Sequence, residues 1–478
     1  MILGGAQRGR SFVPAGFSRA RRALTGQITW LGAPSAGRAR LGIRRDLGGA
    51  PGYCRAMRTL AVIGAGAKGI AIAAKARALA DTGFDPPRVV LVERSAPAAT
   101  WTGRQGYTDG SLPLGTPPEK DVGYPYPPSW GAASDAVTDA MMAYSWPRNL
   151  IAGGTYADWV DRGRQRPTHR EWGAYLREVA VKCGAETLVA EVTALDTEAG
   201  RWRLGLAGGG TLEADGVVVT GPGPPVAVPG QPADHPLVLD GRSYWQHLGQ
   251  MGHRARNICV IGSGETAAWV VITLARHCHR HSAIDVLTSR GVLYSRGESF
   301  DENRFYSDPG DWPRLAESHR REFLDRTDRG VFSVQAEATL NQLRGFRTLA
   351  GRALHIEAGQ RQVVVTAGYG EDRERVAYDL VVVARGFDGH WFERLLGREA
   401  KARLTAARAG DELERRIDVN LAVADLEPPL HLPVLAGLAQ GPGFPNLSCL
   451  GLLSDRVLRR YVPLPAAALE FAERSQRV

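Results

Sequence analysis

Three glycines that follow a β-branched segment have the spacing Gly-x-Gly-x-x-Gly, which is suited to binding a dinucleotide. They are Gly64, Gly66 and Gly69, and an acidic residue, Glu93, ends the next apolar segment. In this pattern the first glycine permits a tight turn, the second lets a pyrophosphate approach the backbone, and the third allows a helix to pack closely on a strand. The Glu93 carboxylate can accept hydrogen bonds from a ribose diol.

A second pattern of the same kind, Gly-x-Gly-x-x-Ala, is formed by Gly262, Gly264 and Ala267. The apolar segment after it ends in hydroxyl and basic residues, among them Ser289 and Arg290, instead of an acid. A carboxylate there would repel a 2′-phosphate, whereas hydroxyl groups and a guanidinium would bind one. We therefore predict FAD at the first pattern and NADPH at the second. The alternative for Arg290 is a solvated loop arginine.

The elements that must position these residues are the same around both patterns. Each pattern joins a β-branched segment to a helical one, and a second β-branched segment follows. The N-terminus of such a helix offers free N–H groups and the positive end of the helix dipole to phosphates. Strands are expected at residues 60–63, 89–92, 258–261 and 284–287. The predicted fold class is α/β, with two Rossmann-like dinucleotide-binding domains.

Two further segments indicate where the chain passes between these domains. Residues 200–225 predict a hairpin that turns at 208–210, then a buried strand and a Gly/Pro segment. Residues 378–392 repeat the design with an acid, a β-branched run and Ala-Arg-Gly-Phe. We expect an NADPH domain inserted into a split FAD domain. The expected parts are a leader (1–56), the first FAD part (57–225), the NADPH domain (226–388) with substrate-binding elements (296–345), and the second FAD part with a C-terminal tail (389–478).

The positive charge of the chain is confined to its first residues. The net charge is +9, and residues 1–56 contain ten arginines and one acid, which leaves 49 basic and 49 acidic residues in the remainder. A neutral body has no electrostatic footprint for nucleic acid. We expect the Arg-rich leader to be disordered, and it is either an organelle transit peptide or, as we prefer, an artefact of the assigned start site.

The cysteines and the hydropathy limit the compartment and the chemistry. The five cysteines are scattered without a CxxC pair, which favours a reducing, cytoplasmic setting and disfavours disulfide reductases. No apolar run approaches the roughly 18 residues of a membrane span. The run "RHCHRH" at 276–281 has metal-like spacing, but we interpret it as a polar helix end and predict no metal site. If NADPH reduces FAD, O2 is the remaining common electron acceptor, and a monooxygenase that works through a flavin hydroperoxide is predicted.

Four irregular stretches carry a family resemblance that extends over nearly all of residues 58–460. They are "LGTPPEKDVGYPYP" (114–127), "RGESFDENRFYSDPGDW" (296–312), "RTDRGVFS" (326–333) and "QGPGFPNLSCLGLLSDRVL" (440–458). In these stretches the chain resembles the flavin-dependent N-hydroxylating monooxygenases of siderophore synthesis, and it is most similar to the mycobactin/nocobactin-type lysine N6-hydroxylases. Many relatives carry Met-Gln beside the flavin where this chain has Leu114 and Gly115.

The resemblance implies roles for particular residues. Lys120 matches the lysine that holds the substrate carboxylate, Asn303 an asparagine that binds the substrate backbone, and Ser454 a serine near the side-chain amine. Trp101 is expected beside the isoalloxazine ring, and a packed aromatic is its alternative. Surface-loop, turn and helix roles are the alternatives for Lys120, Asn303 and Ser454 respectively. No catalytic base is evident in the sequence. This chemistry needs little beyond positioning of the substrate and a site that excludes water.

Several functions remain open from the sequence. The preferred one is NADPH-, FAD- and O2-dependent N6-hydroxylation of L-lysine or of a lysine derivative, which supplies hydroxamate groups for a siderophore. The alternatives are an L-ornithine N5-hydroxylase, an uncoupled NADPH oxidase and, outside enzymes, a nucleotide-binding redox sensor. Whether the lysine is free or acylated, and whether the protein forms a homo-oligomer, is left open.

Overall fold

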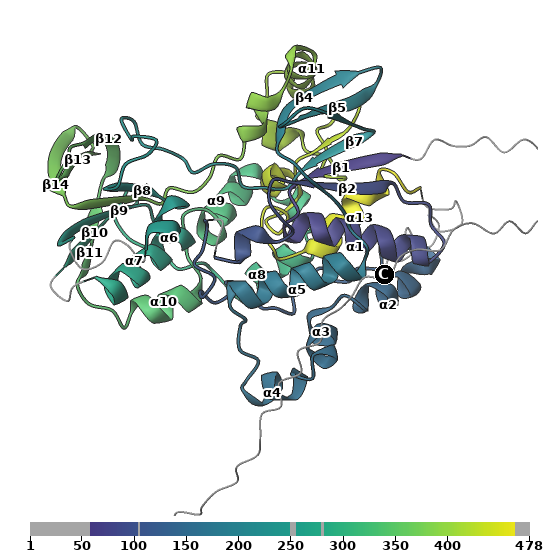
Figure 1. Ribbon diagram of the computed structural model, residues 1–478, viewed down its shortest axis with the longest axis horizontal. Coiled ribbons are helices and arrows are strands. Elements are labelled where there is room, and N and C mark those ends of the chain that lie inside the picture. Colours follow the sequence, from purple (N-terminus) through teal and green to yellow (C-terminus); the bar gives the residue numbers. More distant parts are fainter. Residues whose placement is uncertain (1–57, 104–105, 249–254, 279–281, 464–478) are drawn as a thin grey trace, which may run out of the picture. The chain divides into compact units, whose positions relative to one another are not determined.

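The computed structural model describes residues 58–103, 106–248, 255–278 and 282–463, and the expected leader lies outside them. Its first large sheet is parallel, with the strand order β16-β7-β1-β2-β3. Figure 1 labels the central strands β7, β1 and β2. The strands are β1 (Thr59–Ile63), β2 (Arg88–Glu93), β3 (Glu186–Val189), β7 (Gly216–Val219) and β16 (Leu430–His431). β1 and β7 are buried along their whole length, as expected for β-branched runs covered on both faces.

Helix α1 (Ala67–Asp81) follows β1 directly and packs against α13 (Leu450–Arg459), α2 (Ser134–Met142) and α5 (His169–Lys182). Most of its residues are buried, and its many alanines have side chains small enough to allow this close packing. A buried ion pair fastens α1 to α13: Lys75 Nζ lies 2.7 Å from Asp455 Oδ1, and the two side chains are 3% and 1% exposed.

The second large sheet is also parallel, with the order β11-β10-β9-β15-β8. Its strands are β8 (Val238–Asp240), β9 (Asn257–Ile261), β10 (Ala283–Thr288), β11 (Phe346–Ala350) and β15 (Leu380–Val383). Helix α7 (Glu265–His277) connects β9 to β10 and packs against α10 (Val334–Leu340). The four strands predicted around the two glycine patterns are therefore confirmed, to within a residue or two at their ends.

Two small antiparallel sheets and several shorter helices complete the described part. The strands are β4 (Val192–Glu198), β5 (Arg201–Leu206), β6 (Thr211–Ala214), β12 (Arg352–Ala358), β13 (Val363–Tyr369) and β14 (Asp372–Tyr378). The helices are α3 (Trp146–Ala152), α4 (Tyr156–Asp161), α6 (Ser243–His247), α8 (Phe300–Ser307), α9 (Glu317–Thr327), α11 (Arg398–Arg408) and α12 (Gly437–Gln440). The predicted hairpin is confirmed as β5–β6, whose turn glycines at 208–210 all have positive φ.

The chain passes from the first sheet to the second after β7 and returns between β15 and β16. The fold is therefore α/β with two parallel, Rossmann-like sheets, as predicted. No helix among the described residues is long and apolar enough to cross a membrane.

Candidate active site

Two cavities are lined by predicted site residues, and the larger of them, about 670 Å³ in volume, begins at the first glycine pattern. Gly64, Gly66, Glu93 and Trp101 line it, so four of the five residues predicted for the first site lie together there; the fifth, Gly69, is not among the lining residues. The cavity extends to Glu265 and its helical neighbours at the start of α7. It therefore connects the turn after β1 with the helix that follows the second glycine pattern.

The first turn has the geometry that a pyrophosphate cradle needs. Gly64 has φ +104°, and a Cβ at Gly69 would lie 2.3 Å from the Gly64 carbonyl oxygen, so both positions require glycine. A Cβ at Gly66 would meet no atom within 4 Å, so this position faces open space. Glu93 lies behind the turn, where its Oε2 accepts a hydrogen bond of 3.1 Å from the Ala65 N–H. The ring of Trp101 packs edge-on against His169, with centroids 5.0 Å apart.

The second glycine pattern is built in the same way but is covered differently. Gly262 has φ +142°, and Ala267 is buried below the turn. A Cβ at Gly264 would meet Gly330 Cα at 3.7 Å, and Ser263 Oγ donates a hydrogen bond of 3.1 Å to the Gly330 carbonyl. The segment around Gly330 thus lies over this turn, whereas the first glycine turn opens to the larger cavity.

The two residues predicted to select a 2′-phosphate lie just beyond β10. Ser289 is exposed, and the Arg290 guanidinium donates a hydrogen bond of 3.1 Å to the Asp325 carbonyl. Neither residue is among those that line the larger cavity. Their cofactor role therefore stays a prediction.

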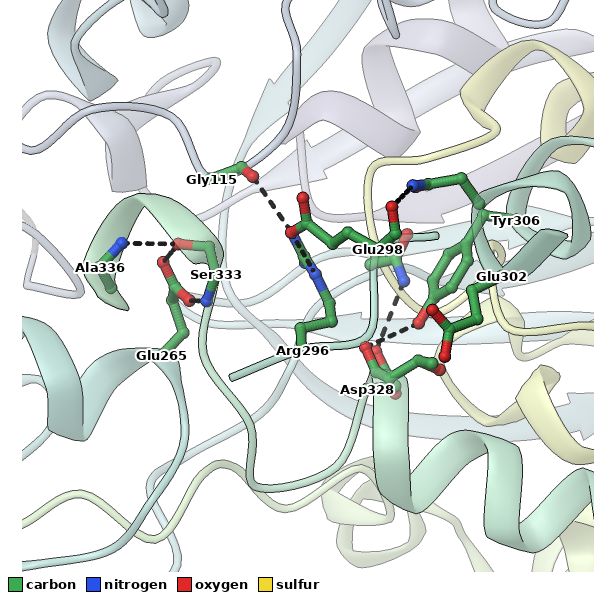
Figure 2. Close-up of polar contacts among 12 residues, drawn as sticks. Gly115, Glu265, Arg296, Glu298, Glu302, Tyr306, Asp328, Ser333 and Ala336 are labelled. Carbon is green, nitrogen blue, oxygen red and sulfur yellow. Dashed lines mark hydrogen bonds and ion pairs between the residues drawn. The ribbon is translucent and has the colours of Figure 1, made fainter. Parts of the chain in front are cut away.

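Glu265, the first residue of α7, is fixed by the neighbouring helix α10 (Figure 2). Its carboxylate accepts hydrogen bonds from the Ser333 N–H at 2.6 Å and the Ser333 hydroxyl at 2.8 Å. A third donor is the Trp269 indole N–H, at 2.9 Å. Ser333 also caps α10 by accepting from the Ala336 N–H. The start of the second dinucleotide helix is thus held in place by side-chain contacts.

The smaller cavity, about 340 Å³ in volume, brings Lys120 and Asn303 together. The two residues lie far apart in the chain: Lys120 is in a loop, and Asn303 is on helix α8. The other lining residues are polar or aromatic for the most part: Thr116, Pro117, Tyr124, Arg296, Gly297, Glu298, Phe300, Arg304, Tyr306, Ser307 and Ser448. A cavity of this size with charged and aromatic walls suits a small polar molecule.

Lys120 contributes an ammonium group to this cavity. Burial, and next the positive charge of Arg296, lower the pKa of Lys120. Its Nζ lies 5.7 Å from the centre of the Tyr124 ring, and no carboxylate among the described residues forms an ion pair with it. A cation that is largely removed from water and forms no ion pair with a described carboxylate can receive an anionic group of a ligand.

An ion pair between Arg296 and Glu298 lines the same cavity and supplies a carboxylate to it (Figure 2). Arg296 donates to Glu298 Oε1 at 2.5 Å and to the Gly115 carbonyl at 3.3 Å. Both side chains line the smaller cavity, and Glu298 is 20% exposed. The sequence analysis predicted a role for neither residue, although both belong to the stretch 296–312. Charged pairs near the start of a helix are common on protein surfaces, so their types alone do not indicate a site.

The two remaining predicted substrate residues differ in their surroundings. The Asn303 amide donates to the Glu298 carbonyl at 2.8 Å, and Asn303 still lines the cavity. Ser454 is fully buried in α13, and its hydroxyl donates to the Leu450 carbonyl at 2.7 Å. Ser454 lines neither cavity, whereas Ser448 lines the smaller one. The substrate role of Ser454 remains a prediction that this geometry does not support.

His390 lies beside the larger cavity and should make stability depend on pH. It precedes the cavity residue Trp391 and donates hydrogen bonds to Glu414 at 3.1 Å and Glu393 at 2.9 Å. These bonds, that to Glu414 first, raise the pKa of His390 to about 9. Because the pKa of His390 is higher in the folded than in the unfolded protein, the protonated imidazole stabilises the fold. This contribution is complete below the unfolded pKa near 6.5 and is lost as the pH rises through about 9.

We therefore expect His390→Gln to lower the free energy of unfolding more at pH 6 than at pH 10. Urea unfolding of both proteins at the two pH values measures the difference. An equal loss at both pH values would show that the charge of His390 does not stabilise the fold.

Two parallel sheets, each with a glycine-rich turn that leads into a helix, define a protein with two dinucleotide-binding folds. A profile of the L-lysine 6-monooxygenase/L-ornithine 5-monooxygenase family matches residues 135–363. The chain is 43% identical over 414 residues to the L-lysine N6-monooxygenase MbtG of Mycobacterium tuberculosis, covering 84% of this chain and 94% of the relative. The Mycolicibacterium paratuberculosis relative of the same name is 42% identical. The chain belongs to this monooxygenase family.

Solved structures agree with this assignment. The lysine monooxygenase NbtG of Nocardia farcinica matches with a TM-score of 0.74 and 40% identity, covering 84% of this chain and 100% of that one. An ornithine N-hydroxylase from Kutzneria has the same fold, with a TM-score of 0.67 at 16% identity, and covers 88% of this chain and 100% of its own.

Proposed function

We propose that this chain is an L-lysine N6-monooxygenase that uses FAD, NADPH and O2. The observation that carries the proposal is the Lys120 ammonium, which forms no ion pair with a described residue, in a cavity with Asn303 and the Glu298 carboxylate. The Mycobacterium and Nocardia relatives are named for lysine oxygenation, and the Kutzneria enzyme was solved with reduced FAD, NADP⁺ and L-ornithine. N6-hydroxylysine becomes an Fe³⁺-chelating hydroxamate on acylation, so we propose a siderophore as its destination.

The residues of the larger cavity fit FAD. The open space at Gly66 leaves room for a pyrophosphate beside the N-terminus of α1, and Glu93 stands at the end of β2, where a ribose is held in such folds. Bound FAD, once reduced by NADPH, supplies the oxygen-activating chemistry. On this basis we propose that residues 57–225 and 389–478 form the FAD domain and residues 226–388 the NADPH domain.

The protein's own residues bind and orient the amino acid. Lys120 would hold the α-carboxylate, because a compact ammonium suits a single carboxylate. Glu298 would accept a hydrogen bond from the α-ammonium, and the Asn303 amide lies beside it. The reacting amine must be neutral, although free lysine has a pKa of about 10.4. A water-poor cavity disfavours the charged form and so helps to keep the amine neutral.

The role of Glu298 can be separated from general damage to the cavity by a substrate that lacks the α-ammonium. We expect Glu298→Gln to raise the KM for lysine by roughly tenfold, the size of a lost charge-assisted hydrogen bond. The same change should leave the already high KM for 6-aminohexanoate nearly unaltered, since that molecule has no α-ammonium. Steady-state hydroxylation kinetics of both proteins with both substrates measure this. Equal increases for the two substrates would contradict the assignment.

The function itself is tested by following NADPH use and hydroxylamine formation together. The purified, FAD-loaded protein is supplied with lysine, ornithine and N6-acetyl-lysine. We expect hydroxylamine to form in step with NADPH oxidation for lysine alone. An ornithine preference would move the chain to the other activity of its family. NADPH use without hydroxylamine for any substrate would show an oxidase instead.

A further inference from the structure

A lysine that the proposed function does not use lies inside the first glycine pattern. Lys68 is the second residue of α1, is only 8% exposed, and lines the larger cavity with Gly64 and Gly66. Its Nζ donates a hydrogen bond of 2.5 Å to the carbonyl of Pro445, on the loop that precedes α13. This is one of five lysines in a chain of 478 residues, so its type and place call for a physical explanation.

The position is unfavourable for a cation in the protein alone. The N-terminus of a helix carries partial positive charge, which repels an ammonium group. Burial adds a cost and lowers the pKa of Lys68 to about 8. Among the described residues no carboxylate forms an ion pair with Lys68, and Asp328 acts on it only through longer-range electrostatics. A neutral carbonyl does not compensate a buried charge, so the compensating anion is expected from a ligand of this cavity.

The neighbours of Lys68 place its ammonium at the wall between the two cavities. The carbonyl that accepts from Lys68 belongs to Pro445, which lines the larger cavity together with Asn446 and Leu447. The next residue, Ser448, lines the smaller cavity. The reactive ring of a cofactor in the larger cavity must lie at this wall to reach a substrate beside Lys120.

We propose that the Lys68 ammonium stabilises the reduced isoalloxazine ring of FAD. The inference rests on the proposed function in assuming that the larger cavity holds FAD. Hydride transfer adds an electron pair and one proton to the neutral ring, so the reduced ring is anionic unless it takes a second proton. A fixed positive charge beside the ring therefore favours the reduced over the oxidised form and raises the reduction potential.

The test compares the midpoint potential of bound FAD in the purified holoprotein and in two variants. Lys68→Gln keeps a neutral donor for the Pro445 carbonyl, and Lys68→Arg keeps the charge. We expect Lys68→Gln to weaken binding of reduced FAD about tenfold more than that of oxidised FAD, which lowers the two-electron potential by about 30 mV. Lys68→Arg should retain the wild-type potential. Lys68→Met serves as the neutral variant if Lys68→Gln does not retain flavin.

Controls separate this role from others. Lys182→Gln removes a lysine charge from the exposed surface of α5 and should leave the potential unchanged. If a neutral variant keeps the wild-type potential, the inference is wrong. If oxidised and reduced FAD are weakened equally, Lys68 serves the pyrophosphate and the inference is also wrong. The measurement needs neither NADPH nor lysine, so a flavoprotein without hydroxylase activity would overturn only the proposed function. A protein that binds no flavin would overturn both.

Discussion

Lys120→Ala should raise the KM for lysine by roughly 10- to 100-fold while the protein still binds FAD and oxidises NADPH. The variant loses a charge-assisted hydrogen bond to the substrate carboxylate, which is worth about 1.5–3 kcal/mol. Lys120 lines the smaller cavity and is not among the residues that line the larger one. The effect should therefore fall on substrate affinity and leave the flavin spectrum as in the wild type. Hydroxylation kinetics and a flavin absorbance spectrum measure the two parts.

The matched control is Lys401→Ala, which removes an exposed lysine of helix α11. It should change neither the KM nor the spectrum. If Lys120→Ala has the wild-type KM, Lys120 is only a loop lysine and the substrate carboxylate binds elsewhere. If the flavin is also lost, the change has altered the fold and the rate data no longer address substrate binding.

Lys75→Met should lower the free energy of unfolding by about 3–5 kcal/mol, the cost of leaving one partner of a buried ion pair uncompensated. Asp455 would then keep only the hydrogen bond of 2.8 Å that its Oδ1 accepts from the Trp130 indole N–H. Its other oxygen, Oδ2, already has no partner among the described residues. Chemical unfolding, monitored by tryptophan fluorescence, gives the difference in free energy.

An exposed pair on helix α5 provides the comparison. Lys182 and Glu178 also lie 2.7 Å apart, but their side chains are 36% and 45% exposed. Lys182→Met should therefore cost less than about 1 kcal/mol. Adding Asp455→Asn to Lys75→Met should recover part of the stability, because asparagine is neutral and can still accept from the Trp130 indole. A Lys75→Met protein as stable as the wild type would show that the pair contributes nothing net.

The fold could be predicted from the sequence to the extent that its signals are local. A glycine turn between a β-branched strand and a helix is specified within about ten consecutive residues, and both such units form where the patterns place them. The return of the chain to the first sheet after β15 was predicted from the acid and β-branched run at residues 378–392. Positive φ at Gly64 and Gly262 shows the physical reason: these turns need a backbone conformation that glycine adopts without strain.

The candidate site was predictable only in part. Lys120 and Asn303 line one cavity, and their substrate roles stay predictions; the Arg296–Glu298 pair, which lines the same cavity, was not predicted. The buried orientation of Ser454 was also not foreseen. The packing of a helix decides which of its side chains face a cavity, and α13 (Leu450–Arg459) packs on α1 (Ala67–Asp81), which is far away in the sequence.

By itself, the sequence determined the two Rossmann-like folds and their order in the chain, and its resemblance to a known family singled out Lys120. Tertiary structure alone decided that Glu298 faces the same cavity as Lys120, that the segment at Gly330 covers the second glycine turn, and that Lys68 is buried with no ion pair to any described carboxylate. The physical reason is range. Turns and periodic strands arise from neighbouring residues, whereas the burial and pairing of a charge depend on segments that meet only in the folded protein.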